Sequence, residues 1–456
     1  MMKVLKFGGT SVGSVESLLN VKDIVESINE PAVVVVSALG GLTDRLIATA
    51  KLAASGNPVY RDEMEAMSLR HFNIISNVVE ESKRPDTISK VSQLLGELKK
   101  IFDGLSLIRD LSERTLCVVV SYGERMSSHI VAAMIEGASR HDSMNFIKTE
   151  KWFGKNIADQ KLTTFLIDEE FSKPFNKAIV PGFISTDRDT GEITNLGRGG
   201  SAFTAALIAA ALDAEILEIW TDVDGFMTAD PRIIKDAEVV PYMSFIESME
   251  LCTFGAKVIY PPTIYPVFHK NIPIKILNTF NPDAPGTLVT DSRHDSKFPI
   301  KGISTLRNTS IFTITGLSDD TISEVSSRTL NALARHGIKI FLLNHRDSRS
   351  GYSFGVAGSD ADITSQQILS EFAPELSTGQ MNAPVRKDSL CTLAVVGEDM
   401  KDRRRLAERI RHTLHRDGIP VLAYSAGSSD TTITYVVESD QADRALELIH
   451  GLIFRD

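Results

Sequence analysis

The chain has 456 residues, 43% of them hydrophobic and 24% charged, which is enough for two or three globular domains. A formal net charge of −10 and the absence of a long basic run argue against a nucleic-acid-binding surface. The three cysteines lie far apart and form no CxxC pair, which argues against a disulfide framework or a zinc site. Residues 1–13 contain no long apolar core of a signal peptide, and no apolar run could cross a bilayer. We therefore expect a cytoplasmic protein that binds neither membranes nor nucleic acid.

The amino-terminal region predicts two buried strands, and each runs into a glycine-rich loop. Residues 4–7 and 32–36 are short apolar runs, followed by Gly-Gly-Thr-Ser at 8–11 and by glycines and hydroxyls at 37–44. A strand, a glycine loop and a helix favour anion binding, because the backbone N–H groups converge on the ligand. The spacing fits neither a Walker A loop nor GxGxxG. Lys6 would lie at the strand's end, where open α/β sheets bind ligands. A solvated lysine is the alternative.

The next region is mostly helical by pattern, from about residue 44 to 111, and residues 116–120 then predict another apolar strand. A helix is expected after this strand, to about residue 136, with Glu124 near its start. A carboxylate there could complement the helix dipole, or it could bind a substrate ammonium. Further elements are expected as a strand and turn at 178–184, a polar hairpin at 186–194, and strands at 215–220 and 274–277, the last of this unit.

A third glycine-rich stretch occupies residues 196–205 and carries Arg198 and Ser201 ahead of a helix to about residue 212. The planar guanidinium of an arginine can bind a carboxylate or a phosphate through paired hydrogen bonds. The alternative is that the glycines only form a tight turn between packed elements. The aspartate-rich loop at 221–232 fails the EF-hand spacing and fits a nucleotide-associated loop better. Since these loops all follow strands, the pattern predicts an α/β fold with a mostly parallel sheet.

The carboxy-terminal part begins after a polar linker at about 291–298 and contains a weak internal repeat. A strand-helix-strand-strand-helix pattern occurs at 310–372 and again at 390–452. This repeat predicts paired ferredoxin-like modules. The basic helix at 401–411 is interpreted as a solvated face.

Several motifs together resemble those of the aspartokinases. The resemblance covers the whole chain, includes tandem ACT domains, and is greatest to the kinase half of bifunctional aspartokinase–homoserine dehydrogenases. It implies an amino-acid-kinase domain at 1–292, a first ACT domain at 300–384 and a second at 385–456. The sequence does not distinguish a monofunctional enzyme from part of a bifunctional one. The motifs are KFGGTS at 6–11, SYGE at 121–124, GRGGS at 197–201, WTDVDG at 220–225 and FGAKV at 254–258.

The resemblance implies ATP-dependent phosphorylation of the side-chain carboxylate of L-aspartate to 4-phospho-L-aspartate, the first step toward lysine, threonine and methionine. A carboxylate is already ionised at neutral pH and needs no general base. Phosphoryl transfer then rests on positioning and charge neutralisation. Mg²⁺ would bridge the phosphates with few protein ligands, and no residue is assigned to the metal. The resemblance also implies a homodimer or higher homo-oligomer, with an amino-acid effector at the ACT domains.

The resemblance also implies site residues, which we assign to the positions of this sequence that match the family's motifs. The catalytic set is Lys6, Gly8, Gly9, Arg198 and Lys257, in which Lys6 and the amides of Gly8 and Gly9 would hold the transferring phosphate. The substrate set is Ser37, Thr43, Glu124, Arg198 and Ser201, in which Arg198 would bind a carboxylate of the substrate and Glu124 its ammonium. The nucleotide set is Lys6, Thr221, Asp222, Asp230, Arg232, Lys257 and Val258.

The chain departs from the family pattern at Ala202, where aspartokinases carry an aspartate that orients the reacting phosphates. We expect binding to be kept and turnover to be reduced. Threonine-sensitive relatives carry glutamine where this chain has Asn344 and Ala426, and lysine-sensitive relatives carry an acidic residue at Phe341. Feedback control is expected, but its effector is not identified.

Two alternatives remain open at this point. A catalytically weakened, amino-acid-sensing regulatory subunit is supported only by Ala202. A kinase for another small amino acid or carboxylic acid would share the sheet and the phosphate loops. Glu124 together with Arg198 favours a substrate that carries both an ammonium and a carboxylate.

Overall fold

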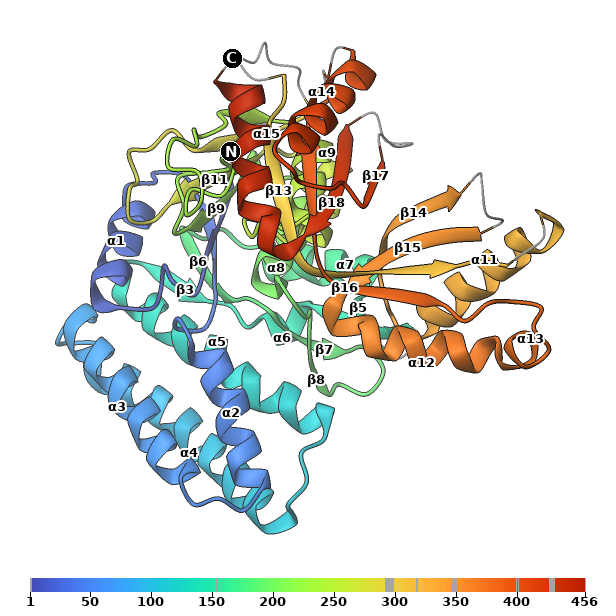
Figure 1. Cartoon of the computed structure of the whole chain (residues 1–456). Helices are drawn as coiled ribbons and strands as arrows, with labels where there is room; N and C mark the ends of the chain where they lie inside the picture. Colours follow the sequence, from blue (N-terminus) through green and yellow to red (C-terminus); the bar gives the residue numbers. More distant parts are fainter. Residues whose placement is uncertain are drawn as a thin grey trace. The chain divides into compact units, whose positions relative to one another are not determined.

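The computed structural model describes residues 2–152, 155–291, 299–316, 319–346, 351–398, 400, 402–425 and 431–455 (Figure 1). The chain divides into two compact units. The first comprises Met1–Phe226, Val239–Ser248 and Val258–Asp295, and the second comprises Met227–Glu238, Met249–Lys257 and Ser296–Asp456. Among the helices of the described chain, none has both the length and the apolar composition that a membrane span requires.

The first unit is built on an eight-stranded sheet with the order β10-β12-β11-β9-β1-β2-β6-β3. Its neighbours from β11 to β3 are parallel, as predicted, whereas β12 is antiparallel to β11. The strand expected to end this unit is therefore not its last, because β12 follows it. The strands are β1 (Lys3–Phe7), β2 (Ala32–Val36), β3 (Ala138–Arg140), β6 (Lys177–Pro181), β9 (Ile216–Thr221), β10 (Tyr242–Met243), β11 (Ile274–Asn278) and β12 (Thr287–Val289).

The strand register brings the predicted loops to one edge of this sheet. Phe7 pairs with Val36 on one side and with Trp220 on the other, and Val36 pairs with Pro181. The chain segments that follow β1, β2, β6 and β9 therefore leave the sheet side by side at its carboxyl edge, where ligands bind in open α/β sheets. All five residues of β2 are fully buried, as its continuous β-branched run predicts.

Helices pack on the sheet and against one another. Helices α2 to α5 form a group of long helices, drawn from blue to cyan in Figure 1, while α8 packs on β1, β2 and β9. The predicted helical region from about residue 44 to 111 is confirmed. The helices are α1 (Val15–Glu26), α2 (Leu42–Ala54), α3 (Tyr60–Val78), α4 (Arg84–Ile108), α5 (Glu113–Met134), α6 (Ser143–Phe146), α7 (Gln160–Glu170), α8 (Gly200–Ala211), η1 (Pro261–Thr263) and α10 (Ile264–Phe268), and α9 (Phe245–Thr253) continues into the second unit.

The strand predicted at 116–120 is wrong, because these residues belong to α5. The helix begins after Ser112, whose hydroxyl accepts a hydrogen bond from the backbone N–H of Thr115. The apolar run looked like a strand because three valines follow one another directly there, and because the helix is buried on all sides from Val119 to Glu124. Glu124 therefore lies in the middle of a helix, so the dipole explanation for this carboxylate is also wrong.

A second, four-stranded sheet has the order β5-β4-β7-β8. Strands β7 and β8 are antiparallel neighbours and confirm the polar hairpin expected at 186–194. The strands are β4 (Lys148–Trp152), β5 (Lys155–Ala158), β7 (Ile184–Asp187) and β8 (Ile193–Asn195).

The second unit contains one six-stranded antiparallel sheet with the order β14-β15-β13-β16-β18-β17, and its elements confirm the predicted internal repeat. The long strands β13 and β16 pair with each other, with register shifts around Thr309. The domain boundaries expected from the sequence stay a prediction. The elements are β13 (Gly302–Ile314), α11 (Asp319–Arg335), β14 (Ile340–Arg346), β15 (Gly351–Ala357), η2 (Gly358–Asp360), α12 (Ala361–Glu371), α13 (Ala373–Ser377), β16 (Val385–Val396), α14 (Arg403–Arg416), β17 (Ala423–Ser425), β18 (Thr432–Glu438), η3 (Ser439–Gln441) and α15 (Ala442–Phe454).

Candidate active site

The carboxyl edge of the first unit's sheet holds a cavity of about 380 Å³. It lies within the first unit, and its walls come from the loops after β1, β2 and β6, from α5 and from the start of α8. Most of the predicted catalytic and substrate-binding residues meet here. The cavity is lined by Lys6, Gly9, Ser37, Ala38, Leu39, Gly40, Gly41, Thr43, Asp44, Glu124, Phe183, Gly197, Arg198, Gly199, Gly200, Ser201 and Ala202.

The two amino-terminal glycine loops pack backbone against backbone. A Cβ atom built on Gly40 would lie 2.9 Å from the carbonyl oxygen of Gly9, and one on Gly9 would lie 3.3 Å from that of Ala38. Neither position tolerates a side chain without displacing main chain. The guanidinium of Arg70, on α3, donates a hydrogen bond to the carbonyl oxygen of Gly13 at 2.8 Å. The glycines therefore serve mainly to bring two loops into contact.

Lys6 places its ammonium beside the first of these loops. A Cβ atom built on Gly8 would lie 3.3 Å from the Nζ atom of Lys6, so the missing side chain at Gly8 leaves room for the ammonium. Burial lowers the pKa of Lys6 from its ordinary value of 10.5 to about 8, and the negative charge of Asp222 only partly opposes this shift. The cavity thus holds a poorly solvated cation, which an anionic phosphate would stabilise.

The two predicted phosphate-binding amides differ in this structure. The N–H of Gly8 donates a hydrogen bond to the carbonyl oxygen of Trp220 at 3.1 Å, which extends the pairing of β1 with β9. Gly9 lines the cavity directly. The amide of Gly8 is therefore already engaged, and the role of Gly8 is better explained by the space it leaves for Lys6.

Glu124 is a buried carboxylate on the wall formed by α5. Its side chain is only 4% exposed, and its Oε2 atom has no hydrogen-bond partner among the described residues. Burial raises its pKa from 4.5 to about 8, although a hydrogen bond from the backbone of Ala38 opposes the shift. A buried carboxyl oxygen without a partner is costly. An ammonium group bound in the cavity would supply that partner.

Gly123 holds α5 close to the loop after β2. A Cβ atom at this position would lie 2.7 Å from the Cβ atom of Ala38, which real Cβ atoms essentially never approach. The neighbouring turn of the helix is tied to the same loop, because the Ser127 hydroxyl donates to the carbonyl oxygen of Ser37 at 2.7 Å. Glycine at 123 therefore fixes the distance between Glu124 and the loop.

We expect Gly123→Ala to destabilise the protein and to weaken substrate binding. Overpacking of this kind typically costs about 1–3 kcal/mol, and the displaced loop carries Ser37 and Thr43. The matched control is Gly104→Ala on α4, where an added Cβ meets nothing within 4 Å. Urea denaturation of both variants should show a lower midpoint for the first and an equal or higher one for the second. Equal midpoints would contradict this account.

Arg198 and Ser201 reach the cavity from the start of α8. The helix begins at a tight backbone turn, because Gly199 has a φ angle of +70° and an added Cβ there would lie 2.4 Å from the Cβ atom of Tyr260. Ser201 packs against Gly182, whose added Cβ would lie 2.7 Å from the Cα atom of Ser201. Arg198 itself is exposed, so its cationic fork is available to a ligand.

Ala202, the departure from the family pattern, also lines the cavity and is 7% exposed. It is the third residue of α8, whose amino end has no side-chain cap. The wall it forms is therefore apolar at a point where a carboxylate would have faced Lys6 and Arg198 across the same cavity.

Phe183 is a cavity residue that the sequence reasoning missed. It follows β6 and has a φ angle of +69°, which is unusual for a residue other than glycine. Its N–H bonds to the hydroxyl of Thr204 at 3.0 Å, and its carbonyl oxygen accepts from Leu196 at 2.9 Å. The only hint in the sequence was the Pro-Gly pair before it, which predicted a turn but not a binding role.

The loop after β9 contributes to the nucleotide set. The hydroxyl of Thr221 donates to Asp222 at 3.2 Å, and the charge of Asp222 acts on Lys6. Asp224 accepts hydrogen bonds from Asn278 at 2.8 Å and from Asn281 at 3.1 Å, so its carboxylate is used within the fold. Thr221 and Asp222 thus lie at the same edge of the sheet as Lys6.

Other predicted nucleotide residues belong to the second unit. Arg232 donates to both carboxylate oxygens of Asp230, with a closest approach of 2.6 Å. Lys257 follows Gly255, where an added Cβ would lie 2.2 Å from the carbonyl oxygen of Thr305. Val258 begins the next stretch of the first unit. Participation of these residues in a nucleotide site stays a prediction.

Two of the predicted effector positions, Phe341 and Asn344, lie on β14. An added Cβ on Gly355 would lie 2.6 Å from the ring of Phe341, so an aromatic ring occupies the position where lysine-sensitive relatives carry an acid. Asn344 pairs in register with Ser353. Ala426 and the loop to residue 430 lie outside the described residues.

The site thus combines a mostly parallel sheet, glycine-rich loops at its carboxyl edge, and a cavity lined by two cations and a buried carboxylate. The chain belongs to the amino acid kinase family, whose model matches residues 1–278, and an ACT domain model matches residues 393–452. Within that family its relatives are aspartokinases, which confirms the resemblance and the fold class expected from the sequence.

The relatives cover the chain almost completely. The bifunctional aspartokinase/homoserine dehydrogenase of Haemophilus influenzae is 31% identical over all of this chain, which spans 57% of that relative. Aspartokinase 1, chloroplastic, of Arabidopsis thaliana is 30% identical over 99% of the chain, which spans 80% of it. The crystal structure of E. coli aspartokinase III in complex with aspartate and ADP has a TM-score of 0.85, with 26% identity and full coverage of both chains.

Proposed function

We propose that this protein is an aspartokinase, which transfers the γ-phosphoryl group of ATP to the side-chain carboxylate of L-aspartate. The observation that carries the proposal is the cavity in which Lys6 and Arg198 face Glu124, a buried carboxylate with an unpartnered oxygen. A substrate with two carboxylates and one ammonium matches these charges. The aspartate and ADP bound to the E. coli relative support the same substrates.

The reaction needs positioning and charge neutralisation more than proton transfer. Aspartate is already ionised at neutral pH, so its side-chain oxygen can attack the γ-phosphorus directly. The new O–P bond forms as the bond to the β-phosphate oxygen breaks, and ADP leaves. Lys6 would neutralise the transferring group, Arg198 would hold the α-carboxylate and Glu124 the ammonium, while Ser37, Thr43 and Ser201 add hydrogen bonds. Ordering the two reactants supplies much of the rate enhancement.

The residues at the site fit a nucleotide that brings Mg²⁺ with it. Among the described residues no group of three or more His, Cys, Asp or Glu side chains converges as a metal site. Mg²⁺ is usually held by one or two carboxylates together with the phosphates of a substrate and water. Asp222, near Lys6, is the carboxylate we assign to that environment. When bound, the ion would neutralise phosphate charge.

The experiment that tests this function measures ADP release in a coupled assay with aspartate, glutamate and N-acetylglutamate, each with ATP and Mg²⁺. We expect release with aspartate only, because glutamate is one methylene too long and N-acetylglutamate lacks the ammonium that Glu124 needs. Release with N-acetylglutamate but not with aspartate would refute the substrate assignment. The absence of release with every substrate, together with amino-acid binding by calorimetry, would favour a regulatory subunit.

The Ala202→Asp variant should turn over faster than the wild type. An aspartate at the third position of α8 would restore a negative charge between the cations and the phosphates, and it would also complement the helix dipole. We expect a gain of about tenfold in kcat with little change in KM for ATP, which corresponds to about 1.4 kcal/mol of barrier. The matched control is Ala202→Asn, which has similar size and no charge. If neither variant gains turnover, the alanine does not limit the reaction.

Regulation and assembly are part of the same proposal. The ACT domain match and the lysine bound to E. coli aspartokinase III in another structure, with a TM-score of 0.76 and 26% identity, support an amino-acid effector. We propose feedback inhibition whose effector is identified by adding lysine or threonine to the ADP assay. We also propose that the protein forms a homodimer or higher homo-oligomer and is located in the cytoplasm. Light scattering tests the oligomeric state.

A further inference from the structure

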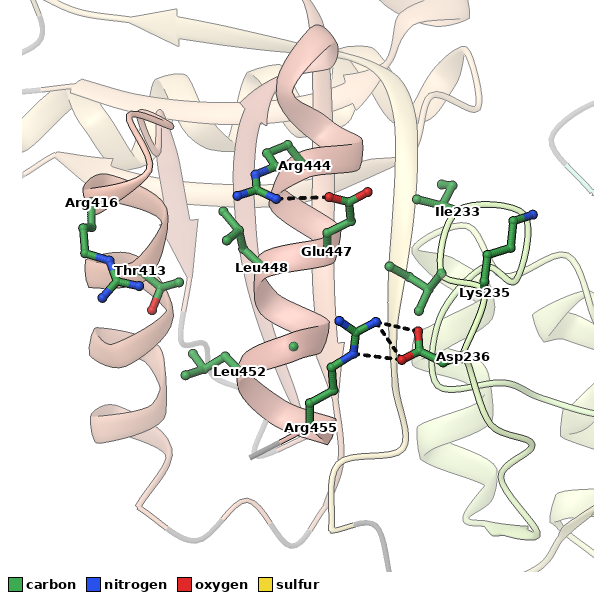
Figure 2. Close-up of a pocket in the computed structure, with 12 residues that line it drawn as sticks. Ile233, Lys235, Asp236, Thr413, Arg416, Arg444, Glu447, Leu448, Leu452 and Arg455 are labelled. Carbon is green, nitrogen blue, oxygen red and sulfur yellow. Dashed lines mark hydrogen bonds and ion pairs between the residues drawn. The ribbon is translucent and has the colours of Figure 1, made fainter.

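The second unit contains a cavity of about 630 Å³ that no sequence motif predicted. It lies over α15, between α14 and the segment around residues 233–236 (Figure 2). Its volume falls within the range of about 300–1,000 Å³ that small-molecule sites occupy. It is lined by Ile233, Ile234, Lys235, Asp236, Thr413, Arg416, Arg444, Glu447, Leu448, Gly451, Leu452 and Arg455.

The floor of this groove is apolar and partly open. Leu448 and Leu452 are one helical turn apart on α15, and with Ile233 they are partly exposed side chains at the edge of the second unit's core. Gly451 lies next to them, and a Cβ atom built there meets nothing within 4 Å. Figure 2 shows both leucines on the side of α15 that faces Thr413 of α14. The glycine therefore leaves a hollow across the helix.

The rim of the groove carries more cations than carboxylates, in a chain whose net charge is −10. Arg455 holds Asp236 through two hydrogen bonds of 2.8 and 2.7 Å, and Arg444 is shared between Asp417 and Glu447 at 3.2 and 3.3 Å. No ion pair involving Lys235 or Arg416 is found within the described part of the chain. Among the described residues these two cations therefore have no charge partner, and Figure 2 shows the side chain of Lys235 directed away from α15.

We propose that this groove binds a small organic anion, in which an apolar body covers the leucines of α15 and an acidic group meets Arg416. The acidic group is a carboxylate or a phosphate, both of which a guanidinium recognises with paired hydrogen bonds. An exposed cation by itself does not indicate a binding site, because water usually solvates it. Here Arg416 lies beside partly exposed aliphatic side chains, and a ligand that is both apolar and acidic would contact both parts of the lining.

The groove is connected to residues that we assign to the nucleotide. Its wall at 233–236 continues the segment that carries Asp230 and Arg232. This segment is anchored to α15 by a hydrogen bond of 3.1 Å between Thr228 and His450 and by the Arg455–Asp236 pair. A ligand that stiffens the segment would change nucleotide affinity. This consequence rests on the proposed function, whereas binding in the groove does not.

The binding test uses phenyl phosphate and phenylacetate as probes and benzyl alcohol as the neutral control, by calorimetry on the full chain. We expect both acids to bind the wild type and the alcohol not to bind. The Arg416→Gln variant should bind about tenfold more weakly, since a lost charged contact is worth on the order of a factor of ten. Comparing the affinities of the two acids shows whether the groove prefers a phosphate or a carboxylate.

A second variant fills the groove without removing charge. Gly451→Leu places a side chain in the hollow and should abolish binding of both acids, while Gly104→Leu on α4, also open in the structure, should bind as the wild type does. Unchanged affinity in both the charge variant and Gly451→Leu would overturn the proposal. So would a Gly451→Leu variant that changes its oligomeric state in light scattering, because the groove would then be an interface between copies.

The coupling between binding in the groove and nucleotide affinity is measured as a change in KM for ATP. Saturating phenyl phosphate should shift it in the wild type and not in Gly451→Leu, and the same shift in both variants would refute the coupling. A chain that binds the probe in this groove but releases no ADP would support the site and contradict the proposed function, so the two failures are distinguishable.

Discussion

Replacement of Lys6 by alanine is expected to lower the turnover number by about 10²- to 10³-fold, the usual loss when one preorganised charge-stabilising group is removed. The ammonium of Lys6 lies above Gly8 at the carboxyl edge of the sheet, where the transferring phosphoryl group is proposed to bind. KM for aspartate should change much less than kcat, because the lysine acts on the phosphate and not on the amino acid. Steady-state kinetics with ATP, Mg²⁺ and aspartate measure both.

The lowered pKa of Lys6 gives this prediction a second readout. Because the pKa of Lys6 is about 8 in the ligand-free protein, the side chain is charged below pH 8 and loses its charge as the pH rises through that value. The profile of kcat/KM for ATP reports groups of the free enzyme, so it should fall above about pH 8. Lys6→Arg, which stays charged, should lack this fall if it retains activity. A Lys6→Ala variant with a near-normal rate would refute the assignment.

The second large effect is expected from Glu124→Gln. The wild-type carboxylate is proposed to pair with the ammonium of aspartate in a buried position, and loss of one partner of such a pair costs about 2–5 kcal/mol. We therefore expect KM for aspartate to rise by about 100-fold or more, with a smaller change in KM for ATP. The amide keeps the size of the side chain, so packing against the loop after β2 should be unaffected.

The raised pKa of Glu124 predicts how aspartate binding depends on pH. The carboxyl group has a pKa of about 8 in the empty cavity, so it is mostly protonated at pH 7 and must ionise to pair with an ammonium. Aspartate binding should therefore release a proton at pH 7 and tighten as the pH rises toward 8. Calorimetry in buffers of different ionisation enthalpy measures that release. Glu124→Gln should release none, and an equal release in both proteins would contradict the pairing.

The sequence predicted the sheet better than it predicted the helices around it. The strand at 4–7 is followed directly by two glycines, and the strand at 32–36 contains a run of four valines after Pro31, so both were short enough to be recognised as strands. The run at 116–120 is also short and apolar, but it belongs to a long helix that is buried on all sides from Val119 to Glu124. Only tertiary packing distinguishes a buried strand from such a buried helix segment, because neither shows a regular pattern of polar and apolar residues.

The candidate site was predictable where a residue's role depends on its position after a strand. Lys6 lies near the carboxyl end of β1 and Ser37 directly follows β2, and the strand register brings these two strand ends together. Glu124 was identified by its motif, but its burial and unpartnered oxygen depend on Gly123, whose close approach to Ala38 no local pattern reveals. Phe183 was missed for a related reason, because its backbone conformation is imposed by contacts from residues distant in the sequence.

The proposed reaction is tested most directly by trapping its product. The protein is incubated with ATP, Mg²⁺, L-aspartate and hydroxylamine, and the amino-acid product is identified by mass spectrometry and by comparison with the two aspartyl hydroxamate isomers. We predict the β-hydroxamate, formed in an amount equal to the ADP released, because the side-chain carboxylate is the acceptor. ADP release without any hydroxamate, or formation of the α-isomer, would contradict phosphorylation of the aspartate side chain.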